Sequence, residues 1–89
     1  MPVVTVVPSI GPYDTPQGGY ELSLRSDTTR QAWGKWYERN DYAYKDALDL
    51  GVATEEHFQG TPAPRIRLKT EATIDTERLN LFGLRETNF

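Results

Sequence analysis

The pattern of hydrophobic and polar positions along the chain predicts three strands. Residues 20–25 and 65–74 alternate apolar with polar side chains, as a strand with one buried face does. A third strand is predicted at 3–7, where every residue is β-branched and a proline stands at each end, Pro2 and Pro8. Because the alternation leaves one face polar, we expect an antiparallel sheet with one face covered and the other in water.

A helical period extends from 27 to 50. At about 100° per residue, one face of this helix collects large apolar side chains and the opposite face collects charges. Gly51 follows, where a left-handed C-cap belongs. The apolar face consists of Trp33, Trp36, Tyr37, Tyr44, Ala47 and Leu48.

Two residues argue against an uninterrupted helix. Asn40 falls inside the apolar stripe, where an unpartnered amide costs about 1–3 kcal/mol. Gly34 weakens the first half by about 1 kcal/mol relative to Ala. The alternative is a break, with Asn40 or Asp41 capping a second helix over 41–50. We expect one helix that is bent or interrupted near residue 40.

The remaining segments are turns, short helices or loops. Residues 8–19 carry three prolines and three glycines, which predict a long loop or arm rather than a helix or a central strand. The glycine pair at 18–19 favours a turn with positive φ. One helical turn is predicted at 54–60, and a short C-terminal helix is predicted after a cap at Asp75 or Thr76.

Together these elements predict a single α+β domain over residues 1–89. Its architecture is a small three-stranded antiparallel sheet with the 27–50 helix packed across it and a short C-terminal helix. In the predicted core, side chains of the helix pack on side chains of the strands. These are Trp33, Tyr37, Tyr44 and Leu48 against Leu22, Leu24, Ile66 and Leu68.

Composition removes several classes of function. The net charge of −3 and the pI near 5 argue against generic binding to nucleic acid or anionic membranes. The sequence has no cysteine, so disulfides and Cys-ligated metal sites are excluded. It has no apolar run near 18 residues and no secretory signal pattern at its start. We expect a cytoplasmic or intracellular protein, or a virion protein if the source is viral, that does not enter membranes.

The sequence shows no pattern that predicts catalysis. His57 is the one histidine, and it lacks the second histidine of a zinc-binding helix. The glycine pair at 18–19 is not a phosphate loop, because a strand follows it and no Lys-Ser/Thr does. Nothing resembles a nucleophile elbow. We therefore expect a protein that is not an enzyme and that uses neither a metal nor a cofactor.

Two surfaces could bind a partner. The predicted core does not include three aromatic residues, Tyr13, Tyr42 and Phe89. Exposed rings are common anchors of protein interfaces. Tyr13 and Phe89 could instead fold back and seal the edges of a small core. The second surface is the basic side of the 65–74 strand, formed by Arg65, Arg67 and Lys69.

These features predict a non-enzymatic interaction protein, a small subunit or an accessory or inhibitory factor that docks on a larger macromolecular assembly. Small compact proteins of viral origin often have this profile, so a viral protein is one form of the prediction. Self-association into a homo-oligomer fits the same features. The alternative is a nucleic-acid-binding module that uses Arg65, Arg67 and Lys69. This alternative rests on the even spacing of the three residues along a strand, which is near the spacing of successive phosphates.

Overall fold

The computed structural model describes residues 3–57, 59–60 and 64–88. Over these residues the chain forms seven strands and two helices. In chain order they are β1 (Val3–Pro12), β2 (Tyr20–Ser26), β3 (Gln31–Tyr37), α1 (Asn40–Leu50), β4 (Ala53–Glu56), β5 (Arg65–Leu68), β6 (Ala72–Asp75), α2 (Thr76–Leu81) and β7 (Arg85–Asn88).

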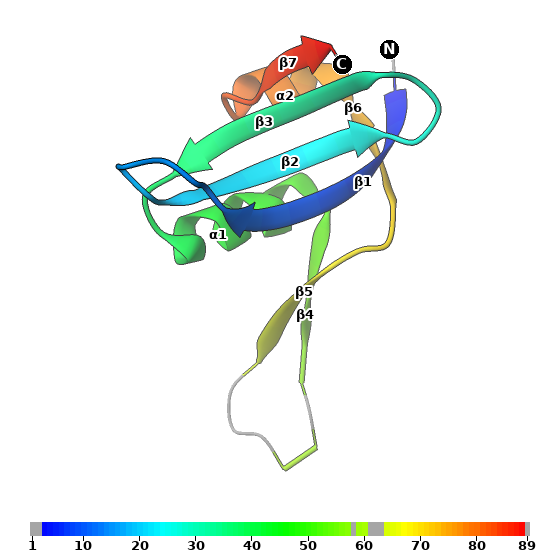
Figure 1. Cartoon of the computed structure of the whole chain (residues 1–89). Coiled ribbons are helices and arrows are strands. Elements are labelled where there is room, and N and C mark those ends of the chain that lie inside the picture. The colour runs from blue at the N-terminus through cyan, green and yellow to red at the C-terminus, as the bar shows by residue number, and fades with distance from the viewer. Residues whose placement is uncertain (1–2, 58, 61–63, 89) are drawn as a thin grey trace.

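The strands belong to two antiparallel sheets. In the described part of the chain, the larger sheet has five strands in the order β6-β1-β2-β3-β7, and β4 pairs only with β5. The α+β class and the antiparallel pairing are confirmed, whereas the prediction of three strands is wrong. The β4–β5 hairpin projects away from the body of the molecule (Figure 1).

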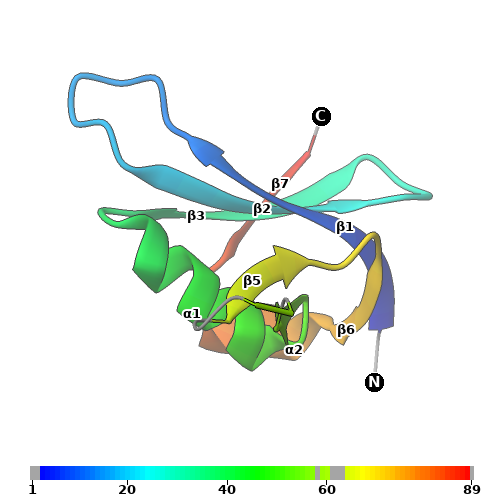
Figure 2. The same ribbon diagram turned by 90° about the horizontal axis from the view of Figure 1, so that it is seen from below.

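Both helices lie on the same side of the larger sheet, as Figure 2 shows. The side chains of β2 that face the helices, Leu22 and Leu24, are fully buried. The β1–β2 loop bends toward the other side, away from α1 (Figure 2). We call that other side the open face, because no helix or strand of the described chain covers it.

The core lies between the larger sheet and the helices. α1 contributes the small side chains of Ala43 and Ala47, which are completely buried and allow the helix to approach the sheet closely. The core cluster comprises Val6, Leu22, Leu24, Trp33, Tyr37, Ala43, Ala47, Leu50, Val52, Ala53, Ile74, Leu79 and Leu84.

The predicted core is confirmed in its centre, whereas Tyr44 and Ile66 do not belong to it. Trp33 and Tyr37 are 4% and 6% exposed. Leu48 and Leu68 are half-buried and pack against the core cluster. Tyr44 is also half-buried. Ile66 is 37% exposed because it lies on β5, outside the body.

The predicted helix over 27–50 is wrong in its first half, which forms β3. Trp33 and Tyr37 are four residues apart, and that spacing puts both on one side in a helix and in a strand. Trp36 distinguishes the helix from the strand, because in a helix it would be buried with Trp33, whereas in a strand it points to the opposite side. It is 41% exposed.

The second half of the segment is helical, as the predicted interruption near residue 40 requires. α1 begins at Asn40, and its N-cap position is Arg39, which makes no side-chain capping bond. Asn40 and Asp41 therefore do not act as the predicted caps. Gly51 ends the helix in the left-handed conformation, with φ of 81°, which confirms the predicted C-cap.

The predicted 8–19 loop is shorter than expected, because β1 continues through Pro12. β6 pairs with β1 only along Val3–Val6. Beyond Val6 one side of β1 is a sheet edge, and an edge strand accommodates a proline that cannot donate to a neighbour. Pro8 and Pro12 both lie in this edge portion, opposite β2.

Two further predictions near the C-terminus are corrected, and one is confirmed. Residues 54–56 of the predicted helical turn over 54–60 belong to β4 instead. The single strand over 65–74 is divided, because β5 pairs with β4 and β6 pairs with β1. The short helix is present as α2, where the Asp75 carboxylate accepts from the backbone N–H of Glu77 at 2.9 Å.

A polar cluster joins α1 to β3. The Tyr37 hydroxyl donates to Oδ2 of Asp46 at 2.6 Å, and Lys35 Nζ lies 3.6 Å from the same oxygen. Lys35 Nζ also donates to the Phe82 carbonyl at 3.0 Å, which ties β3 to the end of α2. Burial raises the pKa of Tyr37 above its ordinary value, and the hydrogen bond to Asp46 and the charge of that carboxylate raise it further.

The two tryptophans distinguish the strand from the helix in an unfolding measurement. Trp33→Ala should lower the free energy of unfolding by about 3–5 kcal/mol, because it removes a buried ring. Trp36→Ala should cost much less, since its ring is partly in water. Urea denaturation followed by circular dichroism measures both losses. Equal losses would contradict the assignment of residues 31–37 to a strand.

Tyr37 should make the stability depend on alkaline pH. Because its pKa is raised on folding, its contribution is complete below the ordinary tyrosine pKa of about 10 and is lost as the pH rises above that value. Tyr37→Phe should lower the free energy of unfolding at neutral pH by about 1–2 kcal/mol. The variant should then lose less stability than the wild type between about pH 9 and 11. Parallel alkaline profiles for the two proteins would rule out this role.

Candidate functional site

The open face presents three rows of side chains that cross the strands. Strand pairing sets these rows, because residues opposite each other on neighbouring strands point to the same side. On β2 the outward residues alternate with buried Leu22 and Leu24. The rows are Gly11–Glu21–Trp36, Ser9–Ser23–Gly34–Arg85 and Val7–Arg25–Ala32.

The middle row is low, because on β1, β2 and β3 it holds only serine and glycine. Two adjoining depressions lie along it, of about 500 and 370 Å³, and both are lined by Tyr13, Glu21 and Ser23. Arg85 lines the first depression and Arg25 the second. The open face is therefore a shallow groove with rings and a carboxylate near one side, Arg25 near the other, and Arg85 at the end of its middle row.

Trp36 is exposed and yet held in place. Its indole Nε1 donates to the Gly18 carbonyl at 2.8 Å. The ring lies against Gly19, where an added Cβ would come within 2.6 Å of Cζ2. Both glycines have positive φ, 68° and 89°, as the sequence predicts for this pair. The β1–β2 loop thus fixes the ring of Trp36 in one position.

Sequence reasoning missed Trp36 as a surface residue, because the helical wheel placed it in the core. The informative signal was the alternation of 31–37 taken with period two, which puts Trp33 and Tyr37 on one side and Trp36 on the other. The glycine pair at 18–19 was a second signal, because a close approach of backbone to a ring requires glycine.

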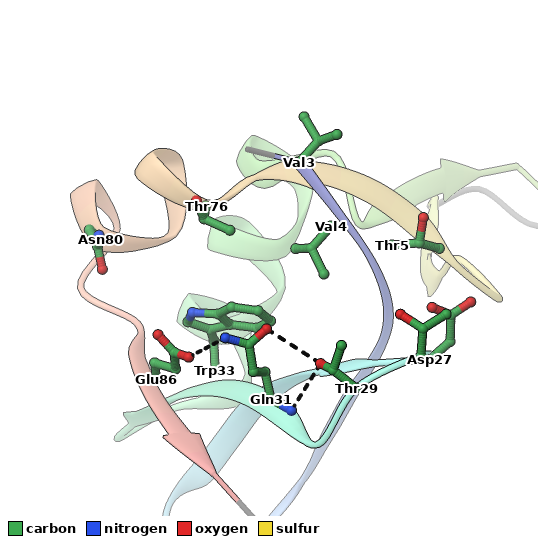
Figure 3. Close-up of a pocket in the computed structure, with 11 residues that line it drawn as sticks. Val3, Val4, Thr5, Asp27, Thr29, Gln31, Trp33, Thr76, Asn80 and Glu86 are labelled. Carbon is green, nitrogen blue, oxygen red and sulfur yellow. Dashed lines mark hydrogen bonds between the residues drawn. The ribbon is translucent and has the colours of Figure 1, made fainter. Parts of the chain in front are cut away.

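A second cavity, of about 650 Å³, lies at the end of the sheet where β1 begins (Figure 3). The Gln31 amide donates to Oε1 of Glu86 at 2.6 Å, and both side chains line this cavity with Trp33. The Thr29 hydroxyl donates to Oε1 of Gln31 at 3.4 Å. Among the described residues, its lining has two carboxylates, those of Asp27 and Glu86, and no cationic side chain. Its chemistry suits an uncharged polar or cationic group rather than an anion.

The structure does not bring Tyr13 and Tyr42, the two predicted anchors that it describes, together. Tyr13 is 42% exposed and lines the groove of the open face near Trp36. Tyr42 is 53% exposed on α1, on the opposite side of the sheet, with the Arg39 guanidinium 6.0 Å from its ring centre. Phe89 lies outside the described residues.

The predicted basic surface at Arg65, Arg67 and Lys69 has an acidic residue beside it. Arg65 and Arg67 are exposed on β5, and Lys69 follows the end of that strand. Glu56 of β4 is directly opposite Arg65, and its carboxylate lies 3.6 Å from the Arg67 guanidinium. The carboxylate offsets part of the positive charge that the sequence suggests.

The described part of the chain contains no group of three or more residues arranged to hold a metal ion. His57, the one histidine of the sequence, is exposed just beyond β4. No helix in the described residues is long and apolar enough to cross a membrane. Comparison with models of protein families, with curated proteins and with solved structures finds no match to this chain.

Two glycine substitutions test how Trp36 is held. Gly19→Ala should push the indole off the loop, because the added Cβ would overlap the ring. Gly18→Ala is the matched control, since Gly18 also has positive φ but an added Cβ meets no atom within 4 Å. Both should lose about 1 kcal/mol from backbone strain, while only Gly19→Ala should increase the exposure of Trp36. Acrylamide quenching of tryptophan fluorescence measures that exposure, and equal quenching in the two variants would disprove the contact.

Proposed function

We propose that this chain is a non-enzymatic interaction protein that docks on a larger protein assembly through the β4–β5 hairpin. The observation that carries the proposal is the projection of this hairpin from the body of the molecule (Figure 1). A two-stranded ribbon is marginally stable in water by itself. Contact with a partner would supply the burial that the hairpin lacks.

The base of the hairpin is anchored firmly, so that it can present its outer part. Val52 and Ala53 are buried in the core, and Leu68 packs against it. The Lys69 N–H donates to the Val52 carbonyl at 3.0 Å and closes the base. Beyond these residues, Ile66 lies opposite Glu55, and both are exposed.

The two sides of the hairpin indicate the chemistry of the partner. Ile66 and Glu55 form one side, where an aliphatic side chain is exposed next to a carboxylate. Thr54, Glu56 and Arg67 belong to the other side, which carries both signs of charge. Mixed charge around an apolar residue suits a protein surface, whereas the glutamates oppose a polyanion. The hairpin therefore favours a protein partner over the nucleic acid of the alternative prediction.

The proposal predicts that Ile66 contributes to partner binding without stabilising the fold. Ile66→Asp should weaken capture of the partner from a lysate of the native source by at least tenfold, with an unchanged melting temperature. Leu81→Asp is the matched control, because Leu81 is an exposed aliphatic residue on α2, at 83% exposure. The Leu81 variant should capture the same proteins as the wild type. Quantitative mass spectrometry compares the three captures.

Equal recovery of every captured protein by the Ile66 and Leu81 variants would disprove docking through the hairpin. Capture of a second copy of this chain would show that the partner is the same protein and that the chain forms a homo-oligomer. Sedimentation of the purified protein would then show a mass above that of the monomer, and Ile66→Asp would lower it.

A further inference from the structure

We infer that the open face of the larger sheet binds single-stranded nucleic acid, with Trp36 stacking on a base and Arg25 and Arg85 contacting phosphates. This surface lies on the body of the molecule, whereas the proposed docking element is the projecting hairpin (Figure 1). The inference therefore does not depend on the proposed function.

The residues of the open face suit bases and phosphates better than a protein partner. Tryptophan, tyrosine and arginine occur in protein interfaces too, but the centres of those interfaces are apolar and depleted in serine and glutamate. The middle of the open face carries Ser23 and Gly34 on its floor and Glu21 beside them. The rings of Tyr13 and Trp36 and the side chains of Arg25 and Arg85 lie around this floor. Every base has a π-face that can stack on a ring, so this combination serves a single strand.

Trp36 is prepared for stacking before any ligand arrives. Its Nε1 is already bonded to the Gly18 carbonyl, and Gly19 supports the ring. Binding therefore has little side-chain freedom left to freeze, which is the main entropic cost at a surface residue. Tyr13 offers a second exposed ring at the same groove. Single-strand binding proteins stack successive bases on aromatic side chains beside a positively charged groove.

The two arginines flank β3 at successive positions on the same side of Trp36, Arg85 on β7 and Arg25 on β2. Arg85 is opposite Gly34, and Arg25 is opposite Ala32. These positions on β3 are two and four residues from Trp36, or about 7 and 13 Å along the strand. A strand of nucleic acid with one base on Trp36 would thus meet cations on one side of that base. The open face has two arginines and one glutamate in its three rows, although the whole chain has a net charge of −3.

Glu21 should make the site discriminate among bases. Its carboxylate lies in the groove next to Trp36 in the pairing of β2 with β3. A carboxylate accepts hydrogen bonds from exocyclic amino groups such as N4 of cytosine, and thymine has no such donor. We expect tighter binding to oligo-dC than to oligo-dT. Duplex DNA should bind more weakly than either, because its bases are stacked on each other and cannot reach the ring.

Fluorescence anisotropy with a labelled dC12 oligonucleotide tests this inference on the full chain. The wild type should bind in low salt, and its affinity should fall as salt rises, because phosphate contacts release counterions. Trp36→Ala should weaken binding by at least tenfold. Tyr42→Ala, which removes an exposed ring on the opposite side of the sheet, should leave it unchanged.

The arginines provide an independent measurement that does not disturb the β1–β2 loop. Arg85→Ala should weaken binding and reduce the salt slope by about one. Arg67→Ala, on the hairpin, is the matched control and should change neither quantity. Melting curves confirm that each variant is folded.

Three results would overturn the inference. They are no binding of dC12 or dT12 at 100 µM protein in low salt, tighter binding to a duplex of the same length, or equal effects of Arg85→Ala and Arg67→Ala. If Trp36→Ala instead abolishes capture of a protein partner while dC12 does not bind, the open face is a protein-docking surface and the inference is wrong.

Discussion

The close approach of α1 to one side of the larger sheet is the constraint on which the rest of the structure depends. Ala43 and Ala47 are spaced one turn apart and are fully buried, so the helix backbone can lie near Leu22 and Leu24. This contact stabilises a small core, because each Å² of apolar surface that is buried contributes roughly 25 cal/mol to the free energy of folding. The Tyr37–Asp46 hydrogen bond then fixes the position of the helix along β3.

Because α1 and α2 occupy the same side, the described residues supply no helix to cover the other side of the sheet (Figure 2). The open face consequently faces water. Its serine, glycine and charged residues include those that alternate with the buried Leu22 and Leu24 along β2. Val7 and Trp36 are exceptions, at 44% and 41% exposure. The β1–β2 loop holds the ring of Trp36 in place through Gly18 and Gly19, and a ring that is both exposed and fixed is suited to contact a ligand.

The two candidate surfaces differ in how they are supported. The hairpin is anchored at Val52 and Ala53 and carries Ile66 away from the body. The groove of the open face belongs to paired strands whose other side is the core, so its residues are held more rigidly. A projecting ribbon that is stabilised by contact suits assembly, whereas a prepared groove suits recognition of a flexible single strand.

Local sequence determined the elements whose signals are local. The alternation at 20–25 predicted β2, Asp75 predicted the start of α2, and Gly51 predicted the end of α1, because alternation, caps and left-handed glycines act within a few residues. Tyr13 and Tyr42 were likewise correctly placed on the surface. The arginines of the open face could not be selected, because their grouping depends on which strands become neighbours.

Tertiary structure decided the elements whose local signals are ambiguous. The spacing of Trp33 and Tyr37 satisfies both helical and strand periods, so the choice fell to pairing with β2 and β7, which turned Trp36 outward. The division of the predicted 65–74 strand came from two different partners, β4 and β1. Pro8 and Pro12 could stay in a strand only because β6 ends its pairing at Val6. A sheet edge is a property of the assembled fold, and no local pattern encodes it.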